Sequence, residues 1–141
     1  MTVCQVQRNN ALSRVEDVIR SGMDPGDGQN PDFNLADVDE NNVLPPITAY
    51  YVMKIGALPL IPYFPPGDID LAKAVQEMAG KHHAVLLANH GPVVAGKNLH
   101  EAVYATEELE ETARLFLLLQ GMKTRFLSSA QVTKLGELFP N

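Results

Sequence analysis

The stretch of sequence that decides the fold is residues 85–96, VLLANHGPVVAG. Its first part, Val85 to Ala88, is a nearly continuous apolar run with the length of a buried strand, and the Gly-Pro pair at residues 91–92 marks a turn. A second apolar piece, Val93 to Ala95, follows and stops at a glycine. The pattern predicts two short strands, or one bent strand, with Asn89 and His90 at the bend. His90 is therefore a candidate metal ligand.

The other histidines are weaker candidates for metal ligands. A catalytic zinc ion takes about three protein ligands and keeps one open position. His82 and His83 are adjacent, so on a strand they would point to opposite faces and could not chelate together, and His100 falls in the first turn of a predicted helix. For His90 itself the residues leave two interpretations open, a ligand or a turn histidine that hydrogen-bonds backbone carbonyl groups.

Composition limits the class of protein. The chain has 141 residues, of which 45% are hydrophobic, which suits one globular domain. Its net charge is -6 and its eleven Lys and Arg residues are scattered, which argues against a nucleic-acid partner. No apolar run approaches the roughly 20 residues of a membrane span, and residues 1–5 do not resemble a secretory signal. With a single cysteine as well, we expect a cytoplasmic protein without membrane contact or disulfides.

Helices and strands alternate after the first forty residues. Pro45-Pro46 favours a helix start, so Ile47 to Ile55 is predicted as a helix. Leu58 to Phe64 is extended, and its prolines make it an edge strand. Asp68 can cap a helix that runs to Gly80.

Two further helices follow the central stretch. Asn98 and Glu101 have the spacing of a capping box for the longest helix, Leu99 to Gln120, and Ser128 with Gln131 has the same spacing for the last one. The apolar residues of the long helix that we expect to pack on the sheet are Leu99, Ala102, Val103, Leu109, Ala113, Phe116 and Leu117. In the last helix, Val132, Leu135 and Leu138 should face inward.

The first third of the chain is less regular. Asn10 to Ser21 has a weak helical stripe, whereas Gly22 to Asn34 is rich in Gly, Asp, Asn and Pro and is typical of a linker or a disordered stretch. Without further information, Tyr50 and Tyr51 are as well explained as core or interface tyrosines as they are by catalysis.

Several motifs resemble the C-terminal half of the class II aldolase/adducin family: residues 84–96, AVLLANHGPVVAG, and residues 102–110, AVYATEELE. Residues 44–53, LPPITAYYVM, and Pro62-Tyr63 are most similar to its 3-oxo-tetronate 4-phosphate decarboxylase branch. The resemblance implies that His90 is the third histidine ligand of a divalent metal, commonly zinc. It also implies that Tyr50 is the catalytic proton donor.

The resemblance runs from about Leu35 to the end of the chain. The family's His-x-His metal motif and catalytic glutamate belong to an N-terminal half that should precede Leu35, and here no histidine occurs before His82. We therefore expect residues 1–34 to be an unrelated or disordered leader and residues 35–141 to be the C-terminal part of the domain, in a truncated or frameshifted copy. The expected fold is α/β, a class II aldolase-like α/β/α sandwich with a small, mainly antiparallel sheet whose N-terminal half is missing.

The implied function is a metal-dependent lyase, an aldolase or decarboxylase, impaired in this chain. Its substrate would be a small phosphorylated sugar acid such as 3-oxo-tetronate 4-phosphate, and by family it would be a homo-oligomer, a tetramer. Zinc would be incompletely held, because the chain supplies one of the usual histidine ligands. Whether the chain is an enzyme therefore stays open, and the alternatives are a non-catalytic assembly subunit or an inert fragment of the family.

Overall fold

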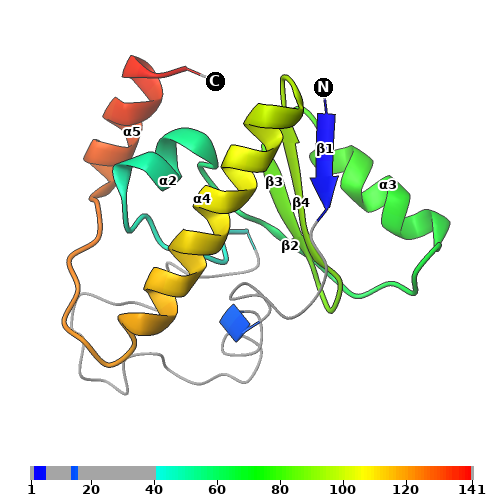
Figure 1. Ribbon diagram of the computed structural model, residues 1–141, viewed down its shortest axis with the longest axis horizontal. Coiled ribbons are helices and arrows are strands. Elements are labelled where there is room, and N and C mark those ends of the chain that lie inside the picture. Colours follow the sequence, from blue (N-terminus) through cyan, green and yellow to red (C-terminus); the bar gives the residue numbers. More distant parts are fainter. Residues whose placement is uncertain (1, 6–13, 16–40, 141) are drawn as a thin grey trace.

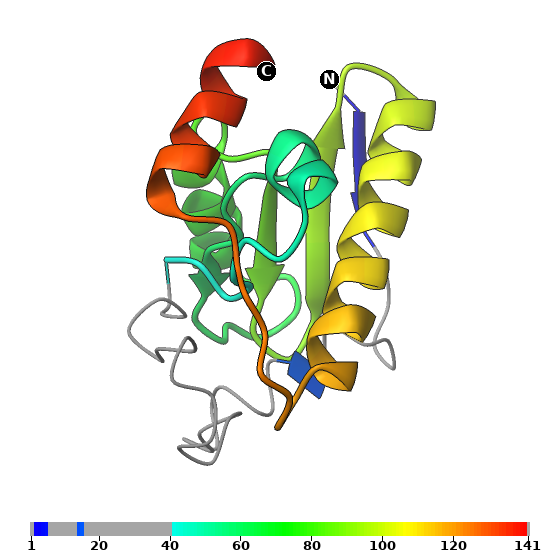
Figure 2. The same cartoon turned by 90° about the vertical axis from the view of Figure 1, so that its left-hand side faces the viewer.

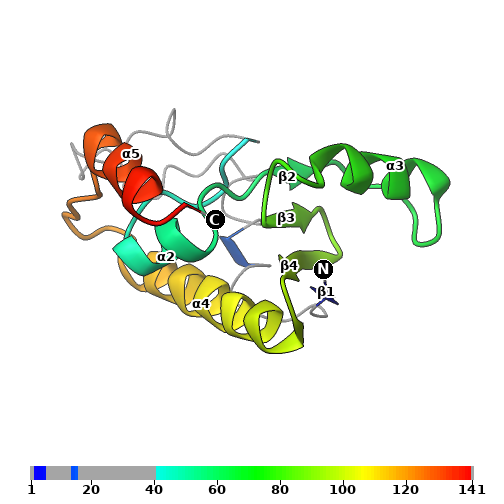
Figure 3. The ribbon, with the colours of Figure 1, turned by 90° about the horizontal axis from the view of Figure 1, so that it is seen from above.

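The computed structural model describes residues 2–5, 14–15 and 41–140. In chain order the elements are β1 (Thr2–Gln5), α2 (Ala49–Lys54), β2 (Leu60–Ile61), α3 (Ile69–Met78), β3 (Ala84–Leu87), β4 (Gly91–Gly96), α4 (Leu99–Leu118) and α5 (Ser129–Leu138) (Figure 1). Figure 3 shows the strands nearly end on, with α2, α4 and α5 on one side of the sheet and α3 on the other. The prediction of an α/β/α sandwich is therefore confirmed.

The sheet has the strand order β1-β4-β3-β2 in the part of the chain that the structure describes. The central pair, β3 and β4, is an antiparallel hairpin, and β1 joins β4 antiparallel. β2 lies parallel to β3, with the Leu86 N–H donating to the Pro59 carbonyl at 2.8 Å and the Ala88 N–H to the Ile61 carbonyl at 3.0 Å. The sheet is thus mainly antiparallel, and the proline-rich segment supplies an edge strand, as predicted.

Alternate residues of the hairpin face opposite layers, as strand geometry requires. Ala84, Leu86 and Val94 belong to the larger apolar cluster, which lies under α2 and α4. Val85 and Leu87 belong to a smaller cluster, against which α3 packs. The apolar residues of α3 that make this contact are only partly buried: Leu71, Ala74, Val75 and Met78. For this reason all four residues of β3, Ala84–Leu87, are buried.

The predicted helix caps are present. Asp68 accepts from the Asp70 N–H at 2.9 Å, and Ser128 forms a complete capping box with Gln131. Asn98 accepts from the Glu101 N–H at 2.9 Å, while the Glu101 carboxylate accepts from the N–H of Lys97, one residue before the position that a capping box uses. Figure 2 shows α5 beside α2, and Thr48 caps α2, which begins two residues later than expected.

Replacing Asn98 with alanine is expected to lower the free energy of unfolding by about 1 kcal/mol. The substitution leaves the Glu101 N–H at the start of α4 without its side-chain acceptor. Urea denaturation followed by circular dichroism measures the change. A matched control is Glu107→Ala on the exposed face of the same helix, for which a change within about 0.5 kcal/mol is expected. Equal losses in the two variants would contradict the capping role.

Three residues that were predicted to face inward are instead exposed. Leu99 and Val103 have 59% and 36% of their surfaces exposed, because the face of α4 that meets the sheet passes through Ala102, Ala105 and Leu109. Leu138, in the last turn of α5, is 61% exposed. The residues of α5 that do pack against the larger cluster are Val132 and Leu135.

Parts of the first forty residues lie outside the described structure. Of the predicted helix at Asn10 to Ser21, only Arg14 and Val15 are described; both are helical, and Val15 is fully buried. The predicted linker, Gly22 to Asn34, falls outside the described residues. The strand Thr2–Gln5 was not predicted. No helix in the described part of the chain is long and apolar enough to cross a membrane.

Candidate active-site corner

The Asn-His-Gly corner, residues 89–91, is a tight turn between β3 and β4. The N–H of His90 donates to the carbonyl of Leu87 at 3.0 Å, which closes the turn. Asn89 has φ of 61°, the only positive value outside glycine among the described residues. A positive φ at the third position of a turn selects Gly or Asn, because these residues tolerate the left-handed conformation. Asn89 therefore shapes the corner that presents His90.

The imidazole of His90 is half-buried and contacts the segment after β2. Its Nε2 lies 2.9 Å from the backbone carbonyl oxygen of Phe64, an ordinary hydrogen-bond distance. Its ring also lies against Tyr63, with centroids 5.8 Å apart and ring planes inclined by 37°. The contact joins two parts of the chain that sequence reasoning did not connect. The prolines around Tyr63 and Phe64 were the available signal, since they fix an extended segment beside the edge strand.

The two adjacent tyrosines of α2 have different environments. Tyr51 is completely buried in the larger cluster, and its hydroxyl makes a long contact of 3.4 Å to the Leu44 carbonyl. Burial raises the pKa of Tyr51 well above its usual value. Tyr50 is 67% exposed. Of the pair, Tyr50 is open to solvent, whereas Tyr51 is a core residue.

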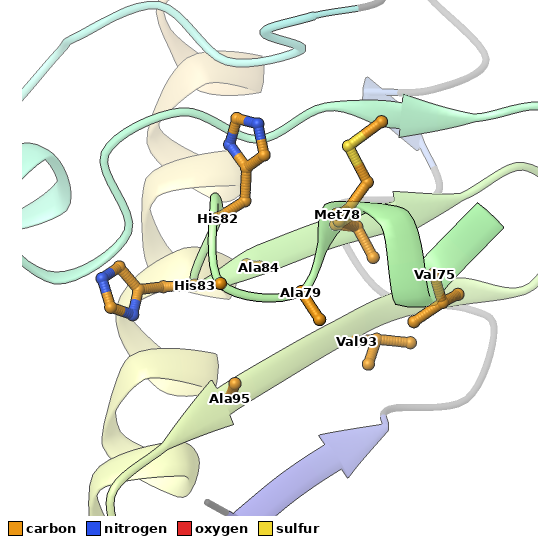
Figure 4. A pocket seen from close by; sticks show the side chains of 10 residues that line it. Val75, Met78, Ala79, His82, His83, Ala84, Val93 and Ala95 are labelled. Carbon is orange, nitrogen blue, oxygen red and sulfur yellow. The ribbon is translucent and has the colours of Figure 1, made fainter. Parts of the chain in front are cut away.

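His82 and His83 lie between α3 and β3, beside a cavity of about 90 Å³ under the end of α3. Both residues precede β3, and are not on a strand as the sequence argument assumed; Figure 4 shows their imidazoles pointing in different directions. The cavity wall is mainly apolar and includes Val75, Met78 and Val93. His100 is exposed on the first turn of α4.

Metal ligands are few at the corner. Among residues 2–5, 14–15 and 41–140, no group of three or more His, Cys, Asp or Glu side chains is arranged to hold a metal ion. His90 has one feature of a ligand, because metal-binding histidines usually donate their second ring N–H to a carbonyl or carboxylate group. The described residues therefore supply a single candidate ligand, and this part of the chain does not by itself fit a complete metal site.

Comparisons with known proteins agree with this architecture. The family described as the Class II Aldolase and Adducin N-terminal domain matches residues 30–117. The chain belongs to the class II aldolase and adducin family. Within it, the chain is 46% identical over 101 residues to the 3-oxo-tetronate 4-phosphate decarboxylase of Escherichia coli O6:H1, covering 72% of this chain and 48% of that protein. It is also 48% identical over 101 residues to the 3-oxo-tetronate 4-phosphate decarboxylase of Haemophilus influenzae, again covering 72% of this chain and 48% of that protein.

A solved structure extends the comparison to the fold. YgbL from Klebsiella pneumoniae is similar with a TM-score of 0.75 and 36% identity, over 94% of this chain and 56% of that one. The chain spans about half the length of the curated relatives that it matches.

Proposed function

We propose that this chain is part of a metal-dependent lyase, a decarboxylase that acts in the cytoplasm on a small phosphorylated sugar acid such as 3-oxo-tetronate 4-phosphate. The observation that carries the proposal is the Asn-His-Gly corner, in a chain 46% identical to proteins of that activity. The corner presents an imidazole whose Nε2 already has a carbonyl partner. Residues 35–141 would form the family domain of this chain, preceded by the leader at 1–34.

His90 is the proposed metal ligand, with zinc as the expected ion. Zinc prefers nitrogen and sulfur ligands, and a catalytic ion would polarise the substrate carbonyl group. The remaining ligands would have to come from outside the described residues, for example from a neighbouring subunit of a homo-oligomer. Because the described residues do not complete the site, we derive no reaction step through the metal.

Tyr50 is the proposed proton donor. Decarboxylation leaves a carbanion or enediolate that must be protonated, and a tyrosine hydroxyl is one of the side chains that can supply this proton. Tyr50 is exposed enough to reach a substrate, whereas the hydroxyl of Tyr51 is buried against Leu44. The proposal needs Tyr50 to approach a substrate held near His90.

Metal binding tests the role of His90. Zinc titration of the wild-type chain, followed by calorimetry and elemental analysis, is expected to show binding that is weaker than at a complete zinc site and that His90→Ala abolishes. The matched control is His100→Ala, because His100 is exposed on α4 and should leave zinc affinity unchanged. Zinc affinity that is negligible in the wild type, or equal in wild type and His90→Ala, would contradict the proposed metal site.

Substituting Tyr50 with phenylalanine tests the proton donor. Loss of a general acid typically slows a reaction by 10²–10⁴-fold, so we expect carbon dioxide release from 3-oxo-tetronate 4-phosphate to fall by about that factor. Thermal stability should not change, since Tyr50 is exposed. Tyr104→Phe, another exposed tyrosine, is the control and should retain full activity. No carbon dioxide release by the wild-type chain, or full activity of Tyr50→Phe, would contradict the assignment.

A second candidate is a non-catalytic assembly subunit. It is favoured by the apolar surface that α4 leaves uncovered near its start, where Leu99, Val103 and Tyr104 are exposed. Apolar patches of this kind often mark protein contacts. Sedimentation of the purified chain distinguishes the candidates: a stable oligomer that binds no zinc would favour assembly over catalysis.

A further inference from the structure

We propose that the outer edge of β1 is a docking site for the same edge of a second copy of this chain, so that the two sheets join antiparallel about Cys4. In the part of the chain that the structure describes, β1 is a terminal strand of the sheet. Figure 3 shows the strands following one another from β2 to β1. A terminal strand presents a row of backbone N–H and C=O groups with which another strand can pair.

The two edges of the sheet differ in how well they are protected. β2 has only two residues, Leu60–Ile61, and Pro59 and Pro62 flank it. Short edge strands and prolines are common features by which proteins prevent pairing at an edge. β1 has four residues, and none of them is a proline or carries a charge: Thr2, Val3, Cys4 and Gln5. Pairing with another chain is therefore open at β1 and hindered at β2.

The hydrogen bonds of β4 determine which backbone groups of β1 point outward. The Ala95 N–H donates to the His83 carbonyl at 2.8 Å, so the backbone groups of Ala95 point toward β3. In an antiparallel ladder the direction alternates from one residue to the next, so those of Val94 point toward β1. Val94 is paired with Cys4. Cys4 therefore directs its N–H and C=O groups toward β4.

Val3 and Gln5 alternate with Cys4, so their backbone groups point away from the sheet. No strand in the described part of the chain pairs with β1 on that side. Two copies that meet antiparallel, with Val3 of one opposite Gln5 of the other, satisfy the N–H and C=O groups of both residues in each chain. A shift by two residues in either direction leaves one of these residues without a partner in β1. The edge therefore favours a single register.

In that register the Cys4 residues of the two copies lie directly opposite each other on a two-fold axis. They form a non-hydrogen-bonded pair, in which the Cα atoms are about 4.5 Å apart. This distance is within the range that a disulfide bridges. Cys4 is the single cysteine of the chain, so any disulfide of the purified protein joins two chains. Cys4 is thus a reporter of the register, whereas the backbone groups of its neighbours make the interface.

The pairing ends at a dimer. A two-fold axis uses the same edge of both copies, so no β1 edge remains after pairing. The joined sheet then ends on both sides in β2, where the prolines hinder further addition. Stable complexes usually bury about 1,200–2,000 Å² in total, more than two four-residue strands supply, so we expect a weak dimer that depends on concentration. Since β1 lies outside the residues that match the family, 30–117, this dimer is independent of the proposed lyase activity.

Cross-linking of the full chain tests the register. The thiol oxidant diamide is added to the purified protein without metal or substrate, and covalent dimer is measured by non-reducing electrophoresis. The matched control carries Val3→Cys and Cys4→Ser, which offsets the two cysteines by two residues in the proposed register. Each rate is divided by the rate at which the same thiol reacts with iodoacetamide. We expect the wild-type chain to cross-link at least about tenfold faster than the control.

Sedimentation of the reduced chain measures association without a covalent bond. With rising concentration, the mass of the wild type should increase from 15.4 kDa toward twice that value. Val3→Pro removes an outward N–H and leaves the bonds between Cys4 and β4 in place, so we expect the dissociation constant to rise about tenfold to a hundredfold. The control is Val3→Thr, which keeps the N–H and should associate as the wild type does.

Three results would overturn the inference: a monomer at every concentration up to about 1 mM, equal corrected cross-linking rates in the two cysteine positions, or a Val3→Pro dimer as stable as that of the wild type. The last result would mean that another surface holds the copies together. If Val3→Pro folds poorly, the cross-linking comparison still decides. A chain that forms this dimer but binds no zinc would count against the proposed function and would leave the β1 interface intact.

Discussion

Replacing Tyr51 with alanine is expected to lower the free energy of unfolding by about 3–5 kcal/mol, the loss typical of truncating a large buried aromatic side chain. Tyr51 is fully buried where α2 meets the larger apolar cluster, so its removal leaves a cavity that neighbours can fill only in part. Since the free energy of unfolding of a small domain is about 5–15 kcal/mol, this substitution would remove much of it. Urea denaturation followed by circular dichroism measures the change.

The neighbouring residue provides the control. Tyr50→Ala removes an identical side chain from the same helix, but this side chain is 67% exposed, and a change within about 0.5 kcal/mol is expected. The pair therefore tests burial alone. Similar losses in the two variants would contradict the assignment of Tyr51 to the core and of Tyr50 to the surface.

The raised pKa of Tyr51 makes the free energy of unfolding depend on pH. Burial favours the neutral phenol, so the folded chain keeps this proton at pH values where the unfolded chain has lost it. The contribution of Tyr51 to stability is complete below its ordinary pKa, near 10, and declines as the pH rises above that value. At one pH unit above it, wild type should have lost about 1.4 kcal/mol relative to Tyr51→Phe. Parallel curves for the two proteins from pH 9 to 11 would show that Tyr51 is not buried in the neutral form.

Gly96→Ala is the second substitution with a large expected effect. A methyl group at this position would collide with the backbone nitrogen of Ala102 and would lie 2.9 Å from its Cα, closer than such atoms normally approach. The obstruction is the backbone of α4, which cannot rotate away as a side chain can. Overpacking of this kind costs about 1–3 kcal/mol or more, and we expect a loss in the upper part of that range.

A glycine-to-alanine substitution in α5 is expected to stabilise the chain instead. Gly136 lies inside this helix, and a methyl group there would meet nothing within 4 Å. Alanine should therefore raise the free energy of unfolding by about 0.5–1 kcal/mol, because it restricts the unfolded chain and favours the helix. Thermal denaturation of both variants gives the comparison. A Gly96→Ala protein as stable as wild type would show that β4 and α4 are not in close contact.

Sequence reasoning predicted local features well. The apolar run before Asn89, the glycine and proline after it, and the cap residues each depend on neighbours within a few positions, and the hairpin and helices follow from them. The errors at Leu99, Val103 and Leu138 have a different origin. Leu99 and Val103 lie beside, and not on, the face of α4 that passes through the buried residues Ala102, Ala105 and Leu109. Leu138 is in the last turn of α5, beyond the two residues of that helix that contact the larger cluster.

The candidate site was predictable only in part. The resemblance identified His90 and Tyr50, and those roles stay predictions. The contact between His90 and Phe64 could not be predicted, because it involves a backbone carbonyl group, which every residue has, and because the two residues come from separate elements. The strand Thr2–Gln5 lacked a signal for a similar reason, since its partner in the sheet is β4, at Gly91–Gly96, far along the sequence.

That strand has a consequence for the order in which the chain folds. β3 and β4 form a hairpin that needs only a short turn to close, a process that takes microseconds in isolated hairpins. β1 reaches the same sheet only when Thr2 meets Gly96, across most of the chain, and closing so long a loop costs entropy before any contact repays it. The hairpin that carries His90 should therefore form first, with β1 docking onto β4 among the last steps. Amides of β3 are accordingly expected to be protected from hydrogen exchange earlier in refolding than those of β1.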